Sequence, residues 1–137
     1  MKDPRIDQLA HNLIFYSCRV KPGDKVLIEA KGQHFELVNA LVAAAYEAKA
    51  LPFVWLREAS TQRALLMGMT QEQMEFTAQR DAEFMSQMDA YIGLRGGDNA
   101  SEMNDVPGEQ TRAYAKIYSA RVHSGIRVPK THWCVLR

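Results

Sequence analysis

Residues Asp89–Asn99, DAYIGLRGGDN, indicate most directly how this chain folds. Their first part, Ala90–Leu94, is a short run of mostly large apolar side chains, and their second part, Arg95–Asn99, is polar and contains two adjacent glycines. An apolar strand that leads straight into a glycine-rich polar loop is typical of the carboxyl edge of a parallel sheet. We therefore predict a central strand at residues 90–94, with helices packed against both of its faces.

Three other segments have the character of strands. Residues 25–30, KVLIEA, contain a run that is apolar on both faces, as expected for a strand that helices cover on both sides. Residues 52–56, PFVWL, and 131–136, THWCVL, are the other two. A predicted helix joins the first two strands, which implies a right-handed crossover and parallel pairing. The predicted fold class is α/β, a mostly parallel doubly wound sheet of about four strands in the order 2-1-3-4, with helices on both faces.

The helices are predicted from capping residues and from apolar positions at helical spacing. They cover residues 4–19, 35–49, 60–67, 70–88 and 105–124. Thr70 and Gln73 have the spacing of a capping box, so a helix is expected to begin there. Ser60 is expected to cap the preceding helix, and Gly125 to end the last one.

The composition is that of one ordinary globular domain, which we expect to span residues 1–137. A net charge of +1 gives no basic surface of the kind that binds nucleic acid or anionic membranes. No apolar run reaches the length of a membrane span, and the N-terminal residues MKDPRIDQLAHNL do not resemble a secretory signal. We therefore expect a cytoplasmic protein in which Cys18 and Cys134 are free thiols.

The chain ends at Arg137, directly after the last predicted strand. Domain boundaries normally fall in polar, flexible segments, whereas Trp133–Leu136 is apolar. The pattern favours the interpretation that the fold is truncated after its fourth strand.

The residues show no constellation that would predict catalysis. The four histidines lack the spacing of metal ligands, and there is no Cys-x-x-Cys pair and no Gly-x-Ser-x-Gly elbow. Acidic pairs such as Asp81 with Glu83 are expected to form a solvated helix face. We predict that the chain contains no catalytic residue and no metal ligand.

The best candidate for a binding or interface site is the loop after the central strand. It consists of Arg95, Gly96, Gly97, Asp98 and Asn99. Paired glycines expose backbone N–H donors beside the guanidinium group, and loops at this edge of a parallel sheet often bind ligands. A purely structural explanation stays open, because glycines permit a tight turn and Asp or Asn can cap it.

A series of segments in a fixed order resembles the N-terminal part of the thermophilic-type metallo-aminopeptidases, the aminopeptidase T and aminopeptidase S family. The segments are KDPRIDQLAHNLIFYS, KPGDKVLIEA, RALLMGMTQEQ, MDAYIGLRGGDN, SEMNDVP and IRVPKTHWCVLR. They extend along essentially the whole chain. Each motif is structural rather than catalytic, so the specificity of the resemblance lies in the ordered series.

The resemblance implies a function that the residues alone do not. Members of that family remove N-terminal residues from peptides with a divalent metal such as cobalt or zinc, held by a C-terminal domain. For this chain it implies an α/β N-terminal domain that is inactive by itself, walls the cavity for the peptide substrate and supports a homodimer. No metal-binding or catalytic position of the family has a counterpart here. The alternative is a free-standing α/β module that binds a small ligand or a protein partner at the loop Arg95–Asn99.

Overall fold

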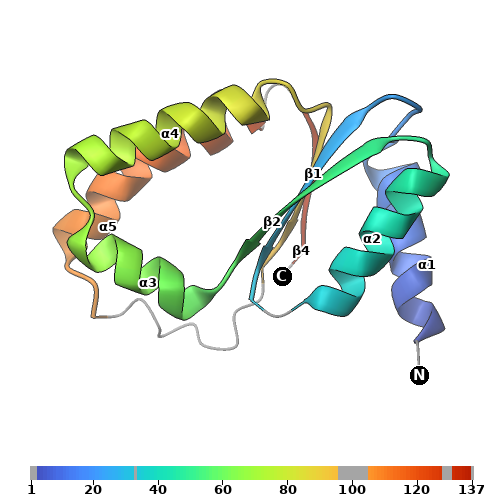
Figure 1. Cartoon of the computed structure of the whole chain (residues 1–137), viewed down its shortest axis with the longest axis horizontal. Coiled ribbons are helices and arrows are strands. Elements are labelled where there is room, and N and C mark those ends of the chain that lie inside the picture. Colours follow the sequence, from blue (N-terminus) through green and yellow to red (C-terminus); the bar gives the residue numbers. More distant parts are fainter. Residues whose placement is uncertain (1–2, 33, 96–104, 128–130, 137) are drawn as a thin grey trace.

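The computed structural model describes residues 3–32, 34–95, 105–127 and 131–136. Its centre is one sheet of four parallel strands in the order β2-β1-β3-β4 (Figure 1). The strands are β1 (Lys25–Lys31), β2 (Leu51–Arg57), β3 (Ala90–Leu94) and β4 (His132–Leu136). This confirms the predicted α/β fold and its strand order, and all the strand pairs are parallel.

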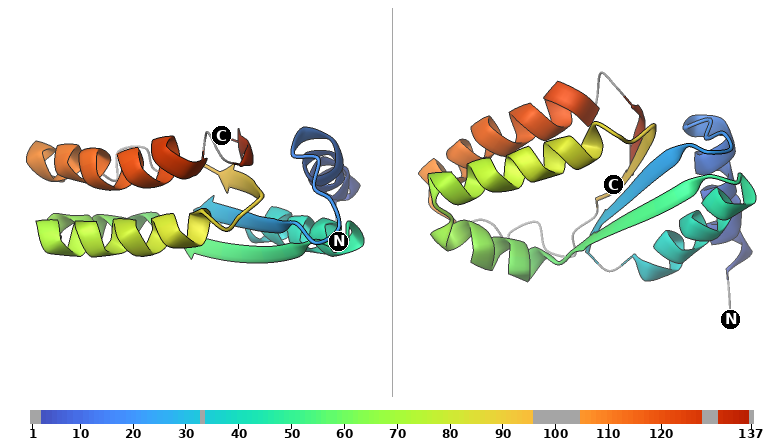
Figure 2. Two further views of the ribbon diagram at one scale, coloured as in Figure 1. Left: turned by 90° about the horizontal axis from the view of Figure 1, so that it is seen from above. Right: turned by 45° about the horizontal axis from the view of Figure 1, so that its top comes forward.

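Helices cover both faces of the sheet. On one face lie α1 (Pro4–Asn12), continued by the π-helical turn η1 (Leu13–Ser17), and α2 (Phe35–Glu47). On the other face, α4 (Gln71–Met85) packs beside the long helix formed by α5 (Gly108–Tyr114) and its π-helical continuation η2 (Ala115–Arg127) (Figure 2). Helix α3 (Ala59–Gly68) follows the carboxyl end of β2. None of the helices in these described ranges is long and apolar enough to cross a membrane.

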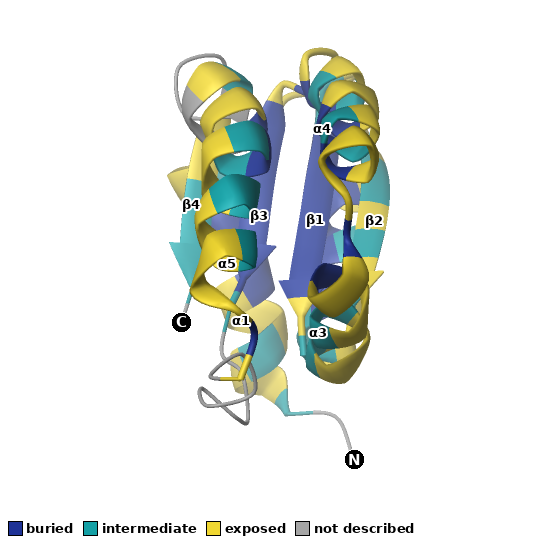
Figure 3. Cartoon of the chain, turned by 90° about the vertical axis from the view of Figure 1, so that its left-hand side faces the viewer, coloured by how far each residue is buried: buried dark blue, intermediate teal, exposed yellow. Residues whose placement is uncertain are grey.

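The central strands β1 and β3 are buried along most of their length (Figure 3). Because side chains alternate along a strand, β1 contributes Ile28 to the core under α1 and α2, and Leu27 to the core under α4 and η2. In β3, Ile92 lies in the core under α1 and α2, and Tyr91 lies in the core under α4 and η2. The two cores explain why both strands are apolar on both faces.

Local capping explains most of the helix starts. Asp3 accepts a hydrogen bond from the backbone N–H of Arg5, and Pro4 occupies the first turn of α1. Thr70 accepts one from the N–H of Gln73, as its spacing predicts. These side chains satisfy backbone donors that have no partner within the helix.

Two predicted helix ends are wrong. Helix α3 is capped by Glu58 and not by Ser60, because the extended backbone of Glu58 lets its carboxylate accept from the N–H of Thr61, while Ser60 already lies in the first turn. The last helix does not stop at Gly125 but continues to Arg127, because the chain widens into π-helical turns instead of ending.

The cysteines are free, as predicted. Cys18 is completely buried in the core under α1 and α2, and Cys134 on β4 is partly buried against the same core. Burial raises the pKa of the Cys18 thiol to about 12, and the neighbouring Cys134 adds to the effect. Such a thiol is held in its neutral, unreactive form.

Candidate functional site at the carboxyl edge of the sheet

The candidate site is built around Glu29, an acidic residue inside the buried strand β1. Its position two residues after Leu27 directs it to the face covered by α4 and η2, and only 2% of its surface is exposed. A carboxylate is stable in such a place only if both of its oxygens have partners. Oε1 accepts a hydrogen bond from the hydroxyl of Tyr91 over 2.5 Å, and Oε2 accepts one from Nε of Arg57 over 2.6 Å.

The register of the sheet explains why these side chains meet. Glu29 lies opposite Gly93 on β3 and opposite Trp55 on β2. Its diagonal neighbours on the same face are therefore Tyr91 and Arg57, which lie within reach of a long side chain. Gly93 has no side chain, so the ring of Tyr91 can lie across it toward Glu29.

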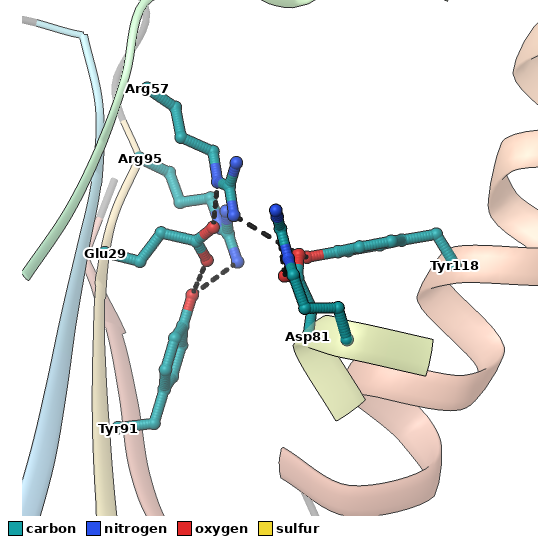
Figure 4. A network of polar contacts seen from close by, with 7 residues as sticks. Glu29, Arg57, Asp81, Tyr91, Arg95 and Tyr118 are labelled. Carbon is teal, nitrogen blue, oxygen red and sulfur yellow. Dashed lines mark hydrogen bonds and ion pairs between the residues drawn. The ribbon is translucent and has the colours of Figure 1, made fainter. Parts of the chain in front are cut away.

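A second buried carboxylate, Asp81 of α4, faces the first (Figure 4). It accepts a hydrogen bond from the hydroxyl of Tyr118 on η2 over 2.5 Å. Arg57 approaches it at 3.4 Å through Nη2, and Arg80 at 3.1 Å from its other side. Arg57 therefore bridges Glu29 on the sheet to Asp81 on the helix, and its guanidinium carbon lies 4.9 Å from the ring centre of Trp55.

The prediction of a solvated helix face at Asp81 is wrong, since only 1% of this residue is exposed. The sequence shows that Asp81 lies on a helix, but not that η2 covers this side of it. Packing of Tyr118 against α4 removes the carboxylate from water and supplies a hydrogen-bond donor in exchange.

Arg95 adjoins this cluster at the end of β3. Its Nη2 donates to the hydroxyl of Tyr91 over 3.1 Å. Its Nη1 is buried and makes no hydrogen bond with any residue that the structure describes. Buried guanidinium N–H groups are normally paired, so this donor is the least satisfied feature of the site.

The surroundings of the cluster shift the pKa values of Tyr118 and Arg57, so that the phenol stays neutral and the guanidinium group stays charged. Burial raises the pKa of Tyr118 well above its ordinary value, and the hydrogen bond to Asp81 and the charge of that carboxylate raise it further. Burial lowers the pKa of Arg57, but the hydrogen bond and charge of Glu29 outweigh this and leave it raised. Tyr118 is thus a permanent proton donor and Arg57 a permanent cation across the physiological range.

A cavity of about 370 Å³ opens beside the cluster. It extends from the face of the sheet at Glu29 to the carboxyl ends of β1 and β2, and α3, α5 and η2 contribute to its lining. Its charged lining includes Lys31, Arg57 and Arg95 in addition to Glu29. Its aromatic lining comes from Tyr114 and Tyr118, whose rings stack at 4.9 Å, and from Trp133 on β4.

Only one residue of the predicted binding loop lies among the residues that the structure describes. Arg95 lines the cavity, whereas Gly96, Gly97, Asp98 and Asn99 lie outside the described residues. Sequence reasoning missed Glu29, Arg57, Asp81 and Tyr118. The sequence did contain one signal for Glu29, because an acidic residue between apolar residues, as in KVLIEAK, is unusual in a strand covered on both faces.

Fold and comparison together define the class of protein. The chain belongs to the thermophilic metalloprotease family (M29), whose model matches residues 2–137. Among solved structures, wild-type AmpT from Thermus thermophilus is similar in fold, with a TM-score of 0.74 and 17% sequence identity. The match covers 97% of this chain and 35% of that one, so the chain spans about a third of the length of AmpT. A search of curated protein sequences finds no match.

The polar cluster does not have the character of a divalent metal site. Among the described residues, no three His, Cys, Asp or Glu side chains come together in a way that could hold a metal ion. The carboxylates of Glu29 and Asp81 already accept hydrogen bonds from a phenol and a guanidinium group each. The positive charge of Arg57 between them would repel a metal cation. These residues therefore do not fit the metal that the family name implies.

Proposed function

We propose that this chain is the N-terminal, non-catalytic part of a metal-dependent aminopeptidase of the cytoplasm that removes N-terminal residues from peptides. The observation that carries the proposal is the family match over residues 2–137. Since the chain corresponds to 35% of AmpT, the proposal assigns the divalent metal, cobalt or zinc, and the catalytic residues to further polypeptide.

In this proposal the carboxyl edge of the sheet forms part of the wall of the peptide cavity. Ligands of parallel α/β sheets bind at the carboxyl ends of the strands. The cavity beside Glu29, Arg57 and Arg95 lies at that edge and combines charged with aromatic groups. The loop Arg95–Asn99 is assigned to the same wall, because it follows β3 directly.

The proposal also includes a homodimer. The edge strand β2 carries apolar side chains that remain substantially exposed: Leu51 at 47%, Val54 at 37% and Leu56 at 57%. An exposed apolar edge strand readily pairs with another chain. A second copy of the chain covering β2 would bury these side chains.

The test of the proposed activity compares two proteins. The 137-residue chain with added cobalt or zinc is expected to release no leucine from a leucyl substrate above the metal-only blank. A product of the same coding sequence read beyond residue 137, if it continues, is expected to release leucine and to lose activity with a chelator. Turnover by the short chain, or no turnover by a longer folded product with either metal, would contradict the proposal.

The test of the dimer uses a matched pair of surface variants. Leu56→Lys places a charge on the exposed edge strand, and is expected to shift the mass measured by light scattering from dimer toward monomer. Phe76→Lys is the control, because Phe76 is 70% exposed and belongs to α4 and not to the edge strand β2. A wild-type chain that is monomeric at high micromolar concentration would refute dimerisation of this part.

A second candidate function is a free-standing α/β module with a small ligand or a protein partner at the loop Arg95–Asn99. The buried Nη1 of Arg95, which has no hydrogen-bond partner among the described residues, favours it. The two functions differ in the leucine-release experiment, because a binding module would stay inactive in every form.

A further inference from the structure

We propose that the cavity beside Arg95 binds one carboxylate group attached to an apolar side chain. This inference rests on the proposed function only in the identity of the natural ligand, which would be the C-terminal end of a short peptide. The binding itself is a property of the residues that line the cavity. Four features of those residues carry the inference.

The first feature is the free donor of Arg95. Nη1 is buried, and it has no hydrogen-bond partner among the described residues. Its other terminal nitrogen is held by Tyr91, whose hydroxyl is held in turn by Glu29. The guanidinium group is thus fixed in orientation while one of its N–H faces remains unused. Because Nη1 has almost no accessible surface, a small shift of the guanidinium group toward the cavity would accompany binding, and a ligand oxygen would then satisfy this donor with a charge-assisted hydrogen bond.

The second feature is the balance of charge. The described lining of the cavity carries three cations, Lys31, Arg57 and Arg95, and one carboxylate, Glu29. Arg57 is in ion pairs with Glu29 and with the neighbouring Asp81, whereas no ion pair joins Arg95 to another described residue. The described lining is therefore positively charged overall, and a carboxylate group would be attracted to it.

The third feature is the apolar part of the lining. Trp133 and Val135 are two residues apart on β4 and therefore lie on the same face, toward the cavity. The stacked rings of Tyr114 and Tyr118 line another side. Aromatic walls with a few convergent polar groups are typical of sites that bind a small organic molecule.

The fourth feature is size. A volume of about 370 Å³ lies near the lower end of the range of small-molecule sites, roughly 300–1,000 Å³. This space suits a single amino-acid residue with a large side chain better than a long peptide. The combined features specify a terminal carboxylate with one aromatic or aliphatic group beside it.

The experiment is a calorimetric titration of the 137-residue chain with N-acetylphenylalanine, with its neutral amide and with inorganic phosphate. The acid is expected to bind at least about tenfold more tightly than the amide, which is the effect of one hydrogen bond to a charged group. Equal affinities for acid and amide, or no binding of the acid, would overturn the inference without any variant. Phosphate binding as tight as that of the acid would overturn the assignment to a carboxylate.

Two variants locate the site. Arg95→Gln is expected to abolish the preference for the acid, whereas Arg112→Gln removes an exposed arginine of α5 outside the cavity lining and is expected to keep it. Circular dichroism verifies that both are folded. If Arg95→Gln is folded and keeps the preference, Arg95 is not the anchor and the inference fails. The titration involves no hydrolysis, so its failure and that of the leucine-release experiment are distinguishable.

Discussion

The hydroxyl of Tyr118 donates a hydrogen bond to the carboxylate of Asp81 over 2.5 Å, and this contact joins two helices through residues that are 37 positions apart in sequence. From Asp81 the polar contacts continue through Arg57 to Glu29 in the middle of the sheet. The helical layer formed by α4 and η2 is therefore connected to the strands by charged groups as well as by apolar packing. Because these groups are buried, removing any one of them leaves a partner unsatisfied.

Tyr118→Phe is expected to lower the free energy of unfolding by about 1–3 kcal/mol, because it removes a donor from a buried carboxylate and retains the ring. The measurement is urea denaturation followed by circular dichroism. Tyr16→Phe is the matched control, since Tyr16 is 70% exposed, and is expected to change stability by less than about 0.5 kcal/mol. Equal effects of the two variants would show that the bond to Asp81 contributes nothing net.

Gly93→Ala is expected to destabilise the protein by about 1–3 kcal/mol, as overpacking of a buried site does. The new Cβ would lie 2.9 Å from the hydroxyl oxygen of Tyr91, which cannot move aside without lengthening its bond to Glu29. Gly68→Ala is the control, because no atom lies within 4 Å of the Cβ position there. Denaturant midpoints of the two variants are the comparison, and a Gly93→Ala variant as stable as Gly68→Ala would contradict the expected crowding.

Thr70→Ala is expected to lower stability by about 0.5–2 kcal/mol, because the hydroxyl of Thr70 caps α4 by accepting from the N–H of Gln73 over 3.1 Å. Thr70→Ser keeps the hydroxyl and serves as the control. Thermal denaturation of the three proteins at one concentration measures the difference. If Ser and Ala are equally destabilising at this position, the lost methyl group and not the cap is responsible.

The buried thiol of Cys18 is expected to make the protein less stable at alkaline pH. Its pKa is raised by burial, and further by Cys134, from an ordinary 9.0 to about 12. Its contribution to stability is complete below about pH 9, where the thiol is neutral in both states. Between about pH 9 and 12 the unfolded chain loses this proton and the folded chain keeps it. Stability should then fall by up to about 1.4 kcal/mol per pH unit.

Denaturation of the wild type and of Cys18→Ala at several pH values measures this effect. The variant is expected to show a shallower decline above pH 9, whatever its stability at neutral pH. The raised pKa of Tyr118 adds a decline in the same direction to both proteins, so only the difference between them reports on Cys18. Parallel curves would show that Cys18 does not titrate differently in the two states.

Much of the scaffold could be predicted because its signals are local. The predicted strand at 90–94 has the bounds of β3, and the apolar run in KVLIEA marks β1. Strand order followed from the handedness of the crossover connections, which depends on backbone chirality and not on particular side chains. The N-caps at Asp3 and Thr70 were equally visible, since a cap and its partner are close in sequence.

The candidate site could not be predicted in the same way. Asp81 was expected in solvent, because helical spacing defines the faces of α4 without saying that η2 covers one of them. Arg57 and Tyr118 carry no motif, and they become part of a site only through a partner far away in the chain. The predicted loop supplied Arg95 alone, since its other residues lie outside the described ranges.

By itself, the sequence determined the elements, their order in the sheet and the family resemblance, because periodicity, caps and crossover handedness act over short distances along the chain. The tertiary structure alone decided which charges were removed from water and what they met there. Glu29 and Asp81 lie 52 residues apart by their numbers, yet one guanidinium group contacts both. Burial of that kind depends on how whole layers pack, and no short segment of the chain encodes it.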